Sequence, residues 1–123
     1  MRVLLDTHVL LWWLSDDQAL SRQHRDVIES LDHEVVVSAV SVAEVAIKAS
    51  LGKLKAPRDV VGAIRESGLD LIDFTPEHAE LLRDLPFHHR DPFDRMLVAQ
   101  AMFERCAFAT ADEKILHYDV TVV

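Results

Sequence analysis

Short apolar segments alternate with helical patterns along the whole chain, and this alternation constrains its fold more than any other feature. Apolar or β-branched runs at 2–5, 34–40, 69–74, 106–110 and 120–123 predict five strands. Helical patterns lie between them, at 7–14, 21–31, 42–54, 58–68, 76–85, 92–105 and 112–116. Such alternation predicts an α/β fold with a mostly parallel five-stranded sheet and helices on both faces.

The composition is that of one soluble folded domain over residues 1–123. Half of the residues are hydrophobic and 28% are charged, which is a globular rather than a disordered balance. No apolar run approaches the ~20 residues that a membrane span needs. Asp6 and His8 interrupt the apolar N-terminal stretch, so we expect no signal peptide and a cytoplasmic protein. The single Cys106 excludes an intramolecular disulfide and a cysteine-built zinc site.

The net charge of −8 argues against a protein that coats nucleic acid nonspecifically, because affinity for phosphate comes largely from Lys and Arg. One local exception contains Lys48, Lys53, Lys55 and Arg58 with no acidic residue among them. Two interpretations remain open for this basic segment. It is either a solvated helix end and loop or a surface that contacts phosphates.

Acidic residues follow the predicted strands. Asp6 follows the first strand, Glu44 lies in the first turn of the helix after the second, and Asp112 follows the fourth. Asp91 and Asp94 open the helix that leads into the fourth strand. Ligands of open parallel sheets bind outside the carboxyl ends of the strands. These acids are therefore the candidates for a functional site.

Each of these acids also has a purely structural interpretation. Ser41–Glu44 and Thr110–Glu113 match the S-x-x-E pattern of a capping box. Asp6 suits an N-cap, and Asp91 suits one too because Pro92 favours the first helical position. Taken alone, the "DPFD" stretch favours helix capping.

Helix capping does not explain why several acids should converge on one edge of a sheet. Two carboxylates ~5 Å apart repel by roughly 3 kcal/mol at an effective dielectric constant of about 20. Such a cluster would oppose folding unless a cation compensated it. Oxygen ligands without cysteine favour Mg²⁺ or Mn²⁺ over zinc. The sequence therefore predicts a site for a hard divalent cation.

Four segments together resemble the PIN domain, and more narrowly the VapC-type toxins of bacterial toxin–antitoxin pairs. They are "LLDTHVLLW", "SAVSVAEVAIKASLGKL", "RDPFDRMLVAQA" and "TADEKI", in the family's order and spacing and spread over almost the whole chain. The resemblance implies a PIN-like three-layer sandwich. It also implies a Mg²⁺-dependent endoribonuclease, with Mn²⁺ as a substitute ion.

The resemblance also implies roles for individual residues. The four catalytic acids are Asp6, Glu44, Asp94 and Asp112, with Asp6 and Asp94 as direct metal ligands and the other two acting through water or a second ion. Thr7, Ser41 and Thr110 fit as hydroxyls that orient the carboxylates. Asp91 either caps its helix or joins the acidic cluster. The resemblance also favours the second interpretation of the basic segment, in which Lys48, Lys53, Lys55 and Arg58 contact RNA phosphates.

The expected partners follow from the same resemblance. They are an RNA substrate, a second copy of the chain in a homodimer, and a cognate antitoxin in a hetero-oligomer. The chain shows no helix-turn-helix or basic arm, so we expect DNA contact only through the antitoxin, and no membrane contact. The apolar helix at "MLVAQAMF" is either buried or at a subunit interface.

Two other functions are compatible with an α/β chain of this length. A phosphate-accepting receiver domain needs adjacent acids after the first strand, but Asp6 is followed by Thr7. A PIN fold that binds without cleaving stays an alternative, although all four acids are present. Among the histidines, His8 is interpreted as packing near the site, and His88 and His89 as loop residues.

Overall fold

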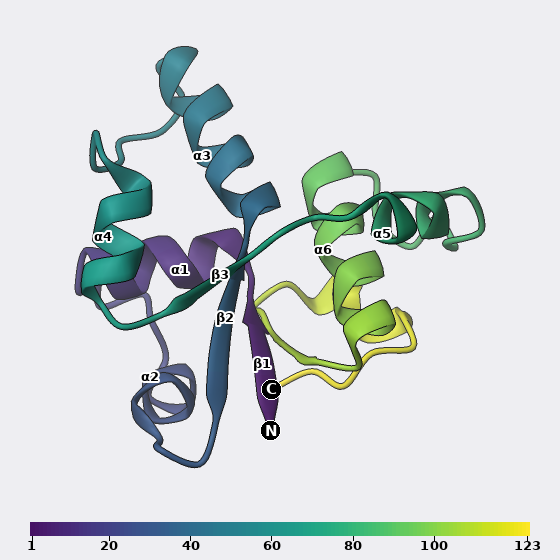
Figure 1. The fold of residues 1–123 in the computed structure, drawn as a ribbon, viewed down its shortest axis with the longest axis horizontal. Helices are drawn as coiled ribbons and strands as arrows, with labels where there is room; N and C mark the ends of the chain where they lie inside the picture. The colour runs from purple at the N-terminus through teal and green to yellow at the C-terminus, as the bar shows by residue number, and fades with distance from the viewer.

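The computed structural model describes residues 1–123 and has an α/β architecture (Figure 1). Four strands lie at β1 (Arg2–Leu5), β2 (Glu34–Ser38), β3 (Asp70–Ile72) and β4 (Ala107–Ala109). Six α-helices lie at α1 (Thr7–Leu14), α2 (Arg22–Glu29), α3 (Ala39–Ser50), α4 (Val60–Glu66), α5 (Pro76–Glu80) and α6 (Pro92–Glu104). Two 3₁₀ turns complete the chain at η1 (Leu81–Arg83) and η2 (Glu113–His117).

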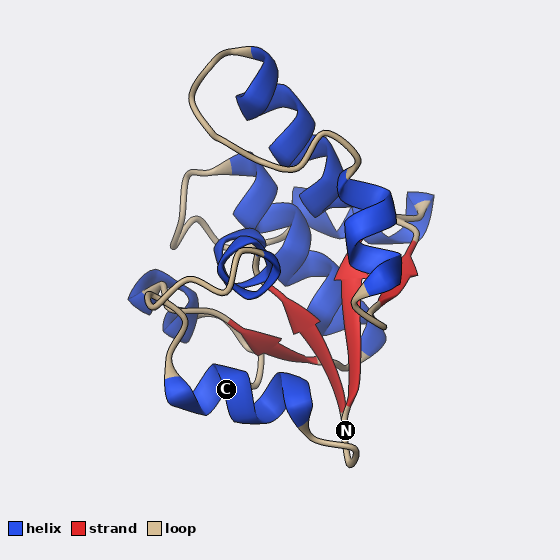
Figure 2. Ribbon diagram, turned by 90° about the vertical axis from the view of Figure 1, so that its left-hand side faces the viewer, coloured by secondary structure: helices blue, strands red, loops and turns tan.

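The strands form one parallel sheet in the order β3-β2-β1-β4. In this register Val3 of β1 lies opposite Val35 of β2 and Ala107 of β4. The strands are splayed as expected of a twisted sheet (Figure 2). Because all four strands run the same way, their carboxyl ends lie along a single edge of the sheet.

Helices cover both faces of the sheet, which gives three layers. Helices α1, α2 and α4 lie on one side and α5 and α6 on the other (Figure 1). Successive strand residues supply the two cores: Val3 and Leu5 pack with the first group, whereas Leu4 packs with the second. Helix α3 continues from the carboxyl end of β2 and contacts both α1 and α6. It therefore stands at the edge where the acids were expected.

The prediction of a fifth strand is wrong. Residues 120–123 run beside β4, but they form only one isolated bridge, between Val122 and Phe108. Phe108 N–H donates to Thr121 O at 2.7 Å, and Val123 N–H donates to Phe108 O at 3.0 Å. Because β4 is only three residues long, pairing does not extend beyond this point.

Several predicted boundaries also shift. The second strand ends at Ser38 instead of residue 40, because Ser38 caps a helix that begins at Ala39. The predicted helix at 76–85 is split into α5 and η1, and the one at 112–116 is a 3₁₀ turn. The apolar helix α6 is largely buried within the domain. No helix has the length and apolar character needed to cross a membrane.

Candidate functional site

The four predicted catalytic acids lie at the carboxyl edge of the sheet. Asp6 directly follows β1, Glu44 is in α3 after β2, and Asp112 follows β4. Asp94 lies in the first turn of α6. The pKa of Asp94 is raised to about 7, first by burial and then by the negative charges of Asp6 and Asp91, with a further contribution from Glu44. The fold thus brings carboxylates from β1, α3 and α6 into electrostatic contact.

Asp6 occupies the N-cap position of α1, but its side chain makes no capping hydrogen bond. The residue is only 5% exposed. Its Oδ2 accepts a hydrogen bond of 2.7 Å from Thr110 Oγ1, while the buried Oδ1 has no partner. Burial raises the pKa of Asp6, and the Thr110 hydrogen bond opposes that shift. The predicted capping interpretation of this acid is therefore wrong.

Glu44 is 2% exposed and faces the same edge. It does not form the predicted capping box with Ser41, because α3 begins earlier, at the Ser38 cap, and this places Glu44 in the second turn. Its Oε2 accepts a hydrogen bond from Lys48 Nζ one helical turn later. Its buried Oε1 has no partner.

The two aspartates of "DPFD" have separate surroundings. Asp91 is the N-cap of α6, and its Oδ1 accepts from the N–H groups of Phe93 at 2.9 Å and Asp94 at 3.0 Å. Asp94 makes no such bond, and its Oδ2 lies 3.2 Å from His89 Nε2. Capping therefore uses Asp91 and leaves the Asp94 carboxylate free to face the other acids.

Asp112 is joined to the cluster through histidine. Its Oδ1 accepts from Lys114 N–H at 3.0 Å, which makes it the cap of η2, and its Oδ2 lies 2.7 Å from His89 Nε2. Burial acts to raise the pKa of Asp112, but the bonds from Lys114 and His89 outweigh it and the pKa is lowered. The predicted Thr110–Glu113 capping box is not formed, because Asp112 takes the cap position.

The three predicted hydroxyls differ in their contacts. Thr110 Oγ1 donates to Asp6 and also accepts from Asp112 N–H at 3.0 Å, so it links two acids. Thr7 Oγ1 and Ser41 Oγ lie 2.9 Å apart and are bonded to each other in a buried position. They join the starts of α1 and α3 without contacting a carboxylate directly.

Of the four predicted basic residues, Lys48 makes the direct contact with the acids. Its hydrogen bond to Glu44 raises the pKa of Lys48, although burial opposes the shift. Lys53, Lys55 and Arg58 are exposed on the segment between α3 and α4. Lys55 and His8 line the same surface groove. Because His8 follows Asp6 and Thr7, this groove runs beside the acidic edge.

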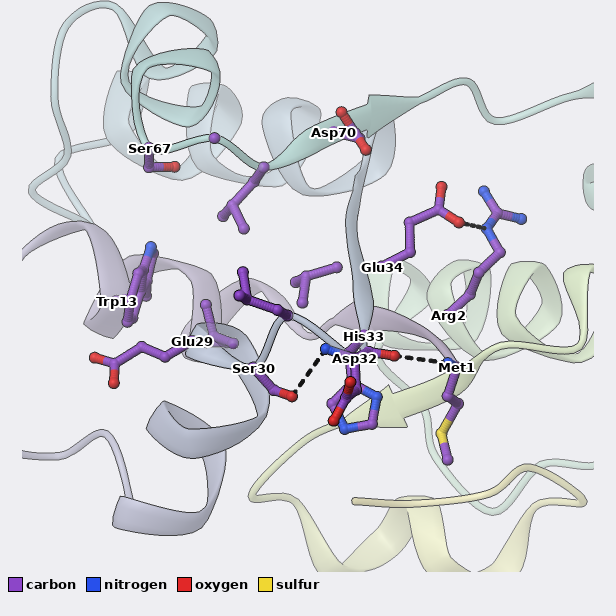
Figure 3. Close-up of a pocket in the computed structure, with 15 residues that line it drawn as sticks. Met1, Arg2, Trp13, Glu29, Ser30, Asp32, His33, Glu34, Ser67 and Asp70 are labelled. Carbon is purple, nitrogen blue, oxygen red and sulfur yellow. Dashed lines mark hydrogen bonds and ion pairs between the residues drawn. The ribbon is translucent and has the colours of Figure 1, made fainter.

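A surface hollow of about 790 Å³ lies elsewhere. Figure 3 shows it around the starts of the strands, with Arg2, Glu34 and Asp70 in its wall. Arg2 Nε lies 3.4 Å from Glu34 Oε2, and the terminal amine of Met1 donates to Asp32 O at 3.3 Å. None of the four predicted catalytic acids lines this hollow. It is therefore separate from the acidic edge.

The acidic edge has the donor set of a site for a hard divalent cation. Its available donor atoms are carboxylate oxygens, and two of them, Asp6 Oδ1 and Glu44 Oε1, are buried without a hydrogen bond. An ionised oxygen left unpaired in the interior destabilises the fold unless a cation binds it. Oxygen donors of this kind suit Mg²⁺ or Mn²⁺.

Comparison with known proteins decides the family. The PIN domain profile matches residues 3–120. The chain belongs to the PIN domain family. It is 30% identical over 116 residues to ribonuclease VapC22 of Mycobacterium tuberculosis (strain ATCC 25618 / H37Rv), covering 92% of this chain and 88% of that protein. The resemblance drawn from the four motifs is confirmed.

Solved structures agree on the fold of this PIN domain. The complex VapBC2 from Rickettsia felis, bound to a DNA fragment from its promoter, matches with a TM-score of 0.75 and 16% identity, covering 100% of this chain and 98% of that chain. A toxin–antitoxin complex from Klebsiella pneumoniae matches with a TM-score of 0.67 and 19% identity, covering 98% and 95%. The predicted PIN-like sandwich is confirmed, with four strands in place of five.

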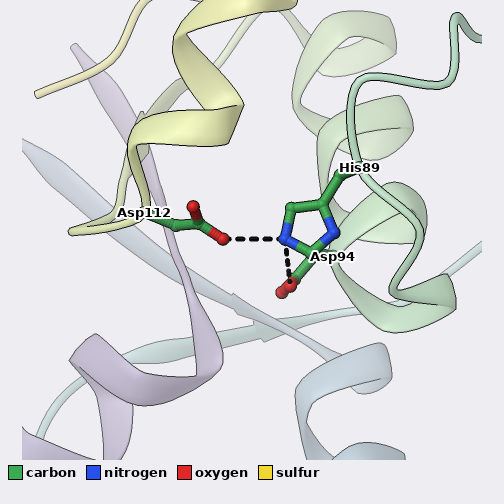
Figure 4. A group of neighbouring side chains, drawn as sticks. All are labelled: His89, Asp94 and Asp112. Carbon is green, nitrogen blue, oxygen red and sulfur yellow. Dashed lines mark hydrogen bonds and ion pairs between the residues drawn. The ribbon is translucent and has the colours of Figure 1, made fainter.

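Sequence reasoning missed one residue of this PIN domain's acidic edge. His89 lies in a loop, as predicted, and its side chain, only 10% exposed, lies between Asp94 and Asp112 (Figure 4). Nitrogen and oxygen atoms of these three side chains all lie within 4.8 Å of one another. The available signal was its position two residues before the Asp91 cap, since that spacing keeps it near the start of α6.

Proposed function

We propose that this PIN domain is a divalent-metal-dependent endoribonuclease and the toxin of a toxin–antitoxin pair. Two observations together carry the proposal: Asp6 and Glu44 each have a buried oxygen without a hydrogen-bond partner, and burial, together with the charges of both, raises the pKa of Asp94. The similarity to ribonuclease VapC22 supports RNA as the substrate. Mg²⁺ is the proposed ion, and Mn²⁺ substitutes for it.

In this proposal Asp6 and Asp94 hold the cation directly. Glu44 and Asp112 act through water or through a second ion. A bound divalent cation supplies Lewis-acid activation of water and neutralises charge that develops at phosphorus. Thr110 orients the Asp6 carboxylate through its 2.7 Å hydrogen bond.

Positive side chains near the acidic edge are the proposed contacts for the RNA strand. Lys48 neutralises part of the acidic cluster through Glu44 and offers an ammonium group at its rim. Lys53, Lys55 and Arg58 are exposed on the neighbouring segment. We assign all four to contacts with the phosphates that flank the cleaved bond, because a strand entering an acidic edge needs positive charge on its path.

The test is cleavage of total tRNA and of a defined structured RNA by antitoxin-free protein in Mg²⁺, in Mn²⁺ and in EDTA. We expect metal-dependent cuts that Asp94→Asn reduces by about 100-fold or more. Asp26→Asn is the matched control, because Asp26 lies on the exposed face of α2 in a surface pair with Arg22. A folded wild type that yields no metal-dependent ends across a whole transcriptome would contradict the nuclease and favour a binding module.

The proposed partners are a cognate antitoxin and a second copy of the chain, with DNA reached only through the antitoxin. The matched VapBC2 and Klebsiella structures are complexes, and this supports an antitoxin for the present chain. A groove of about 740 Å³ between α3 and α4 has an apolar lining that includes Val42, Ala46 and Val60, with Lys55 and Arg58 among its polar residues. We place an apolar antitoxin segment with acidic flanks in this groove.

Co-expression in bacteria tests that placement. Ala46→Arg fills the groove, so we expect the antitoxin to lose control of the toxin and cell growth to stop. Ala79→Arg, an exposed alanine on α5, is the matched control and leaves neutralisation intact. Continued neutralisation of Ala46→Arg would place the antitoxin elsewhere. Sedimentation of the purified chain tests the homodimer separately.

A further inference from the structure

His89 contacts protein groups through both ring nitrogens. Its Nε2 lies 2.7 Å from Asp112 Oδ2 and 3.2 Å from Asp94 Oδ2, and Figure 4 shows the ring between the two carboxylates. On the opposite edge, Nδ1 accepts a hydrogen bond of 3.0 Å from the backbone N–H of Asp91. The ring therefore bridges the cap of α6 and the two more exposed acids of the cluster.

This hydrogen-bond pattern places the ring proton. A nitrogen that accepts from a backbone N–H carries no proton itself, so in the neutral ring the proton is on Nε2. Nε2–H then points at two carboxylate oxygens as a donor. A metal ligand needs the lone pair of that same nitrogen. His89, Asp94 and Asp112 have the spacing of a metal-binding triad, but the ring is arranged to donate.

The segment that carries His89 is held firmly. Its backbone N–H donates to Tyr118 Oη at 2.9 Å. The guanidinium of Arg95, a residue only 7% exposed, donates to Leu85 O at 3.1 Å and Pro86 O at 2.8 Å. The Arg95 guanidinium also lies 3.9 Å from the centre of the Phe87 ring. The ring of His89 is thus positioned by α6 and the C-terminal segment together.

The Asp112 carboxylate has few hydrogen-bond partners. It follows β4 on a segment outside the sheet, and its side chain is 34% exposed. Apart from its local bond to Lys114 N–H, its carboxylate has one partner, which is His89. We propose that His89 is a positioning residue: its Nε2–H holds Asp112 beside Asp94, and the ring binds no metal.

This inference concerns the same site as the proposed nuclease, but its first test needs neither RNA nor metal. Long-range ¹H–¹⁵N correlation spectra of the full chain at pH 8 report the tautomer, with the His89 signals assigned by their loss in His89→Gln. We expect the Nε2–H tautomer without metal and after addition of Mg²⁺. A proton on Nδ1 in the metal-free protein, or its transfer from Nε2 when the ion is added, would overturn the proposal.

Binding of Mn²⁺, followed by electron paramagnetic resonance, separates positioning from ligation. His89→Ala removes the donor, so we expect about tenfold weaker binding. His89→Gln keeps an N–H donor of similar reach and restores most of the affinity. His88→Ala is the control, because His88 is exposed and its ring packs against those of His117 and Tyr118, away from the acids. Wild-type affinity in His89→Ala, or a Gln variant as weak as Ala, would overturn the proposal.

Electron spin echo modulation of the bound Mn²⁺ gives an independent reading. A directly bound imidazole nitrogen modulates the echo strongly, whereas a ring that only donates to the ligands does not. We expect the wild type and His89→Gln to give the same weak nitrogen signal. A strong signal that disappears in His89→Gln would show that the ring is a ligand. Failure of RNA cleavage alone changes none of these readings, so the two proposals fail separately.

Discussion

The hydroxyl of Thr110 donates a hydrogen bond of 2.7 Å to Asp6 Oδ2, which joins the carboxyl ends of β4 and β1. The other oxygen of Asp6 is buried without a partner. Thr110 thus holds the carboxylate through one oxygen and leaves the other without a hydrogen bond. This contact is the simplest reason why a buried acid is oriented in the absence of a capping bond.

Replacement of Thr110 by valine tests this contact. Thr110→Val keeps the shape of the side chain but leaves both Asp6 oxygens without a hydroxyl donor. We expect a loss of ~1–2 kcal/mol in the free energy of unfolding and about tenfold weaker Mn²⁺ binding. Urea denaturation and a Mn²⁺ titration measure the two effects. Thr121→Val, at an exposed position, is the control; equal behaviour of the two variants would show that the hydroxyl does not orient Asp6.

Stability of the metal-free protein should depend on the ionisation of Asp94. Its pKa is about 7 in the folded protein, against about 3.9 in an unfolded chain. Because the folded protein binds the Asp94 proton more tightly than the unfolded chain does, protonation stabilises the fold. This stabilisation is complete below about pH 4 and is lost as the pH rises through 7. Burial raises the pKa of Asp6 too, so its contribution has the same sign.

Asp94→Asn should remove the fall in stability that accompanies ionisation of Asp94, because the amide stays neutral at every pH. In EDTA, we expect its stability advantage over the wild type to grow by about 1–2 kcal/mol between pH 5 and pH 8, and then to level off. Urea denaturation at several pH values measures this growth. An advantage that stays constant across that range would show that Asp94 ionises normally.

Lys48 should stabilise the fold through Glu44. Lys48→Met leaves a buried carboxylate without its cation, and Glu44 is 2% exposed. Because Lys48 is itself partly exposed, we expect a moderate loss of ~1–3 kcal/mol in the metal-free protein. In a Glu44→Gln background, the same substitution should cost less than about 0.5 kcal/mol. Equal losses in both backgrounds, measured by urea denaturation, would show that the pair is not coupled.

The two aspartates of "DPFD" should respond differently to amidation. Asn caps helices about as well as Asp, so Asp91→Asn should change stability by less than about 0.5 kcal/mol, whereas Asp91→Ala should lose ~1–2 kcal/mol. RNA cleavage should survive Asp91→Asn and fail in Asp94→Asn. Urea denaturation and the tRNA cleavage assay provide the two measurements. Equal loss of cleavage in both amide variants would place the Asp91 carboxylate in the active site.

Much of this fold could be predicted from the sequence, because the patterns that indicate its helices and strands are local and agree with one another. β-branched runs, prolines at helix starts and the alternation of elements predicted the layers and the parallel sheet. The fifth strand failed because pairing depends on a neighbour: residues 120–123 meet a β4 of only three residues and bridge it once, at Phe108. Nothing in the valine-rich segment itself could show this.

The site shows the same division between local and long-range information. The cap at Asp91 could be predicted because the pattern that indicates it, "DPFD", spans only four residues. The S-x-x-E match at Ser41 predicted the wrong helix start. Ser38 lies three residues earlier, and its side chain caps α3 instead. The contacts of His89 were missed because two of its partners, Asp112 and Tyr118, lie more than 20 residues away in the sequence, beyond β4.

The most direct test of the central claim is a Mn²⁺ titration of the purified chain, monitored by electron paramagnetic resonance and repeated with Mg²⁺ as competitor. The claim is that the buried acids at the sheet edge form the cation site used for RNA cleavage. We expect saturable binding in the wild type and in Asp26→Asn. In Asp6→Asn and Glu44→Gln we expect binding at least about tenfold weaker, with cleavage lost in parallel. Binding that is absent from the folded wild type, or unchanged by both substitutions, would contradict the claim.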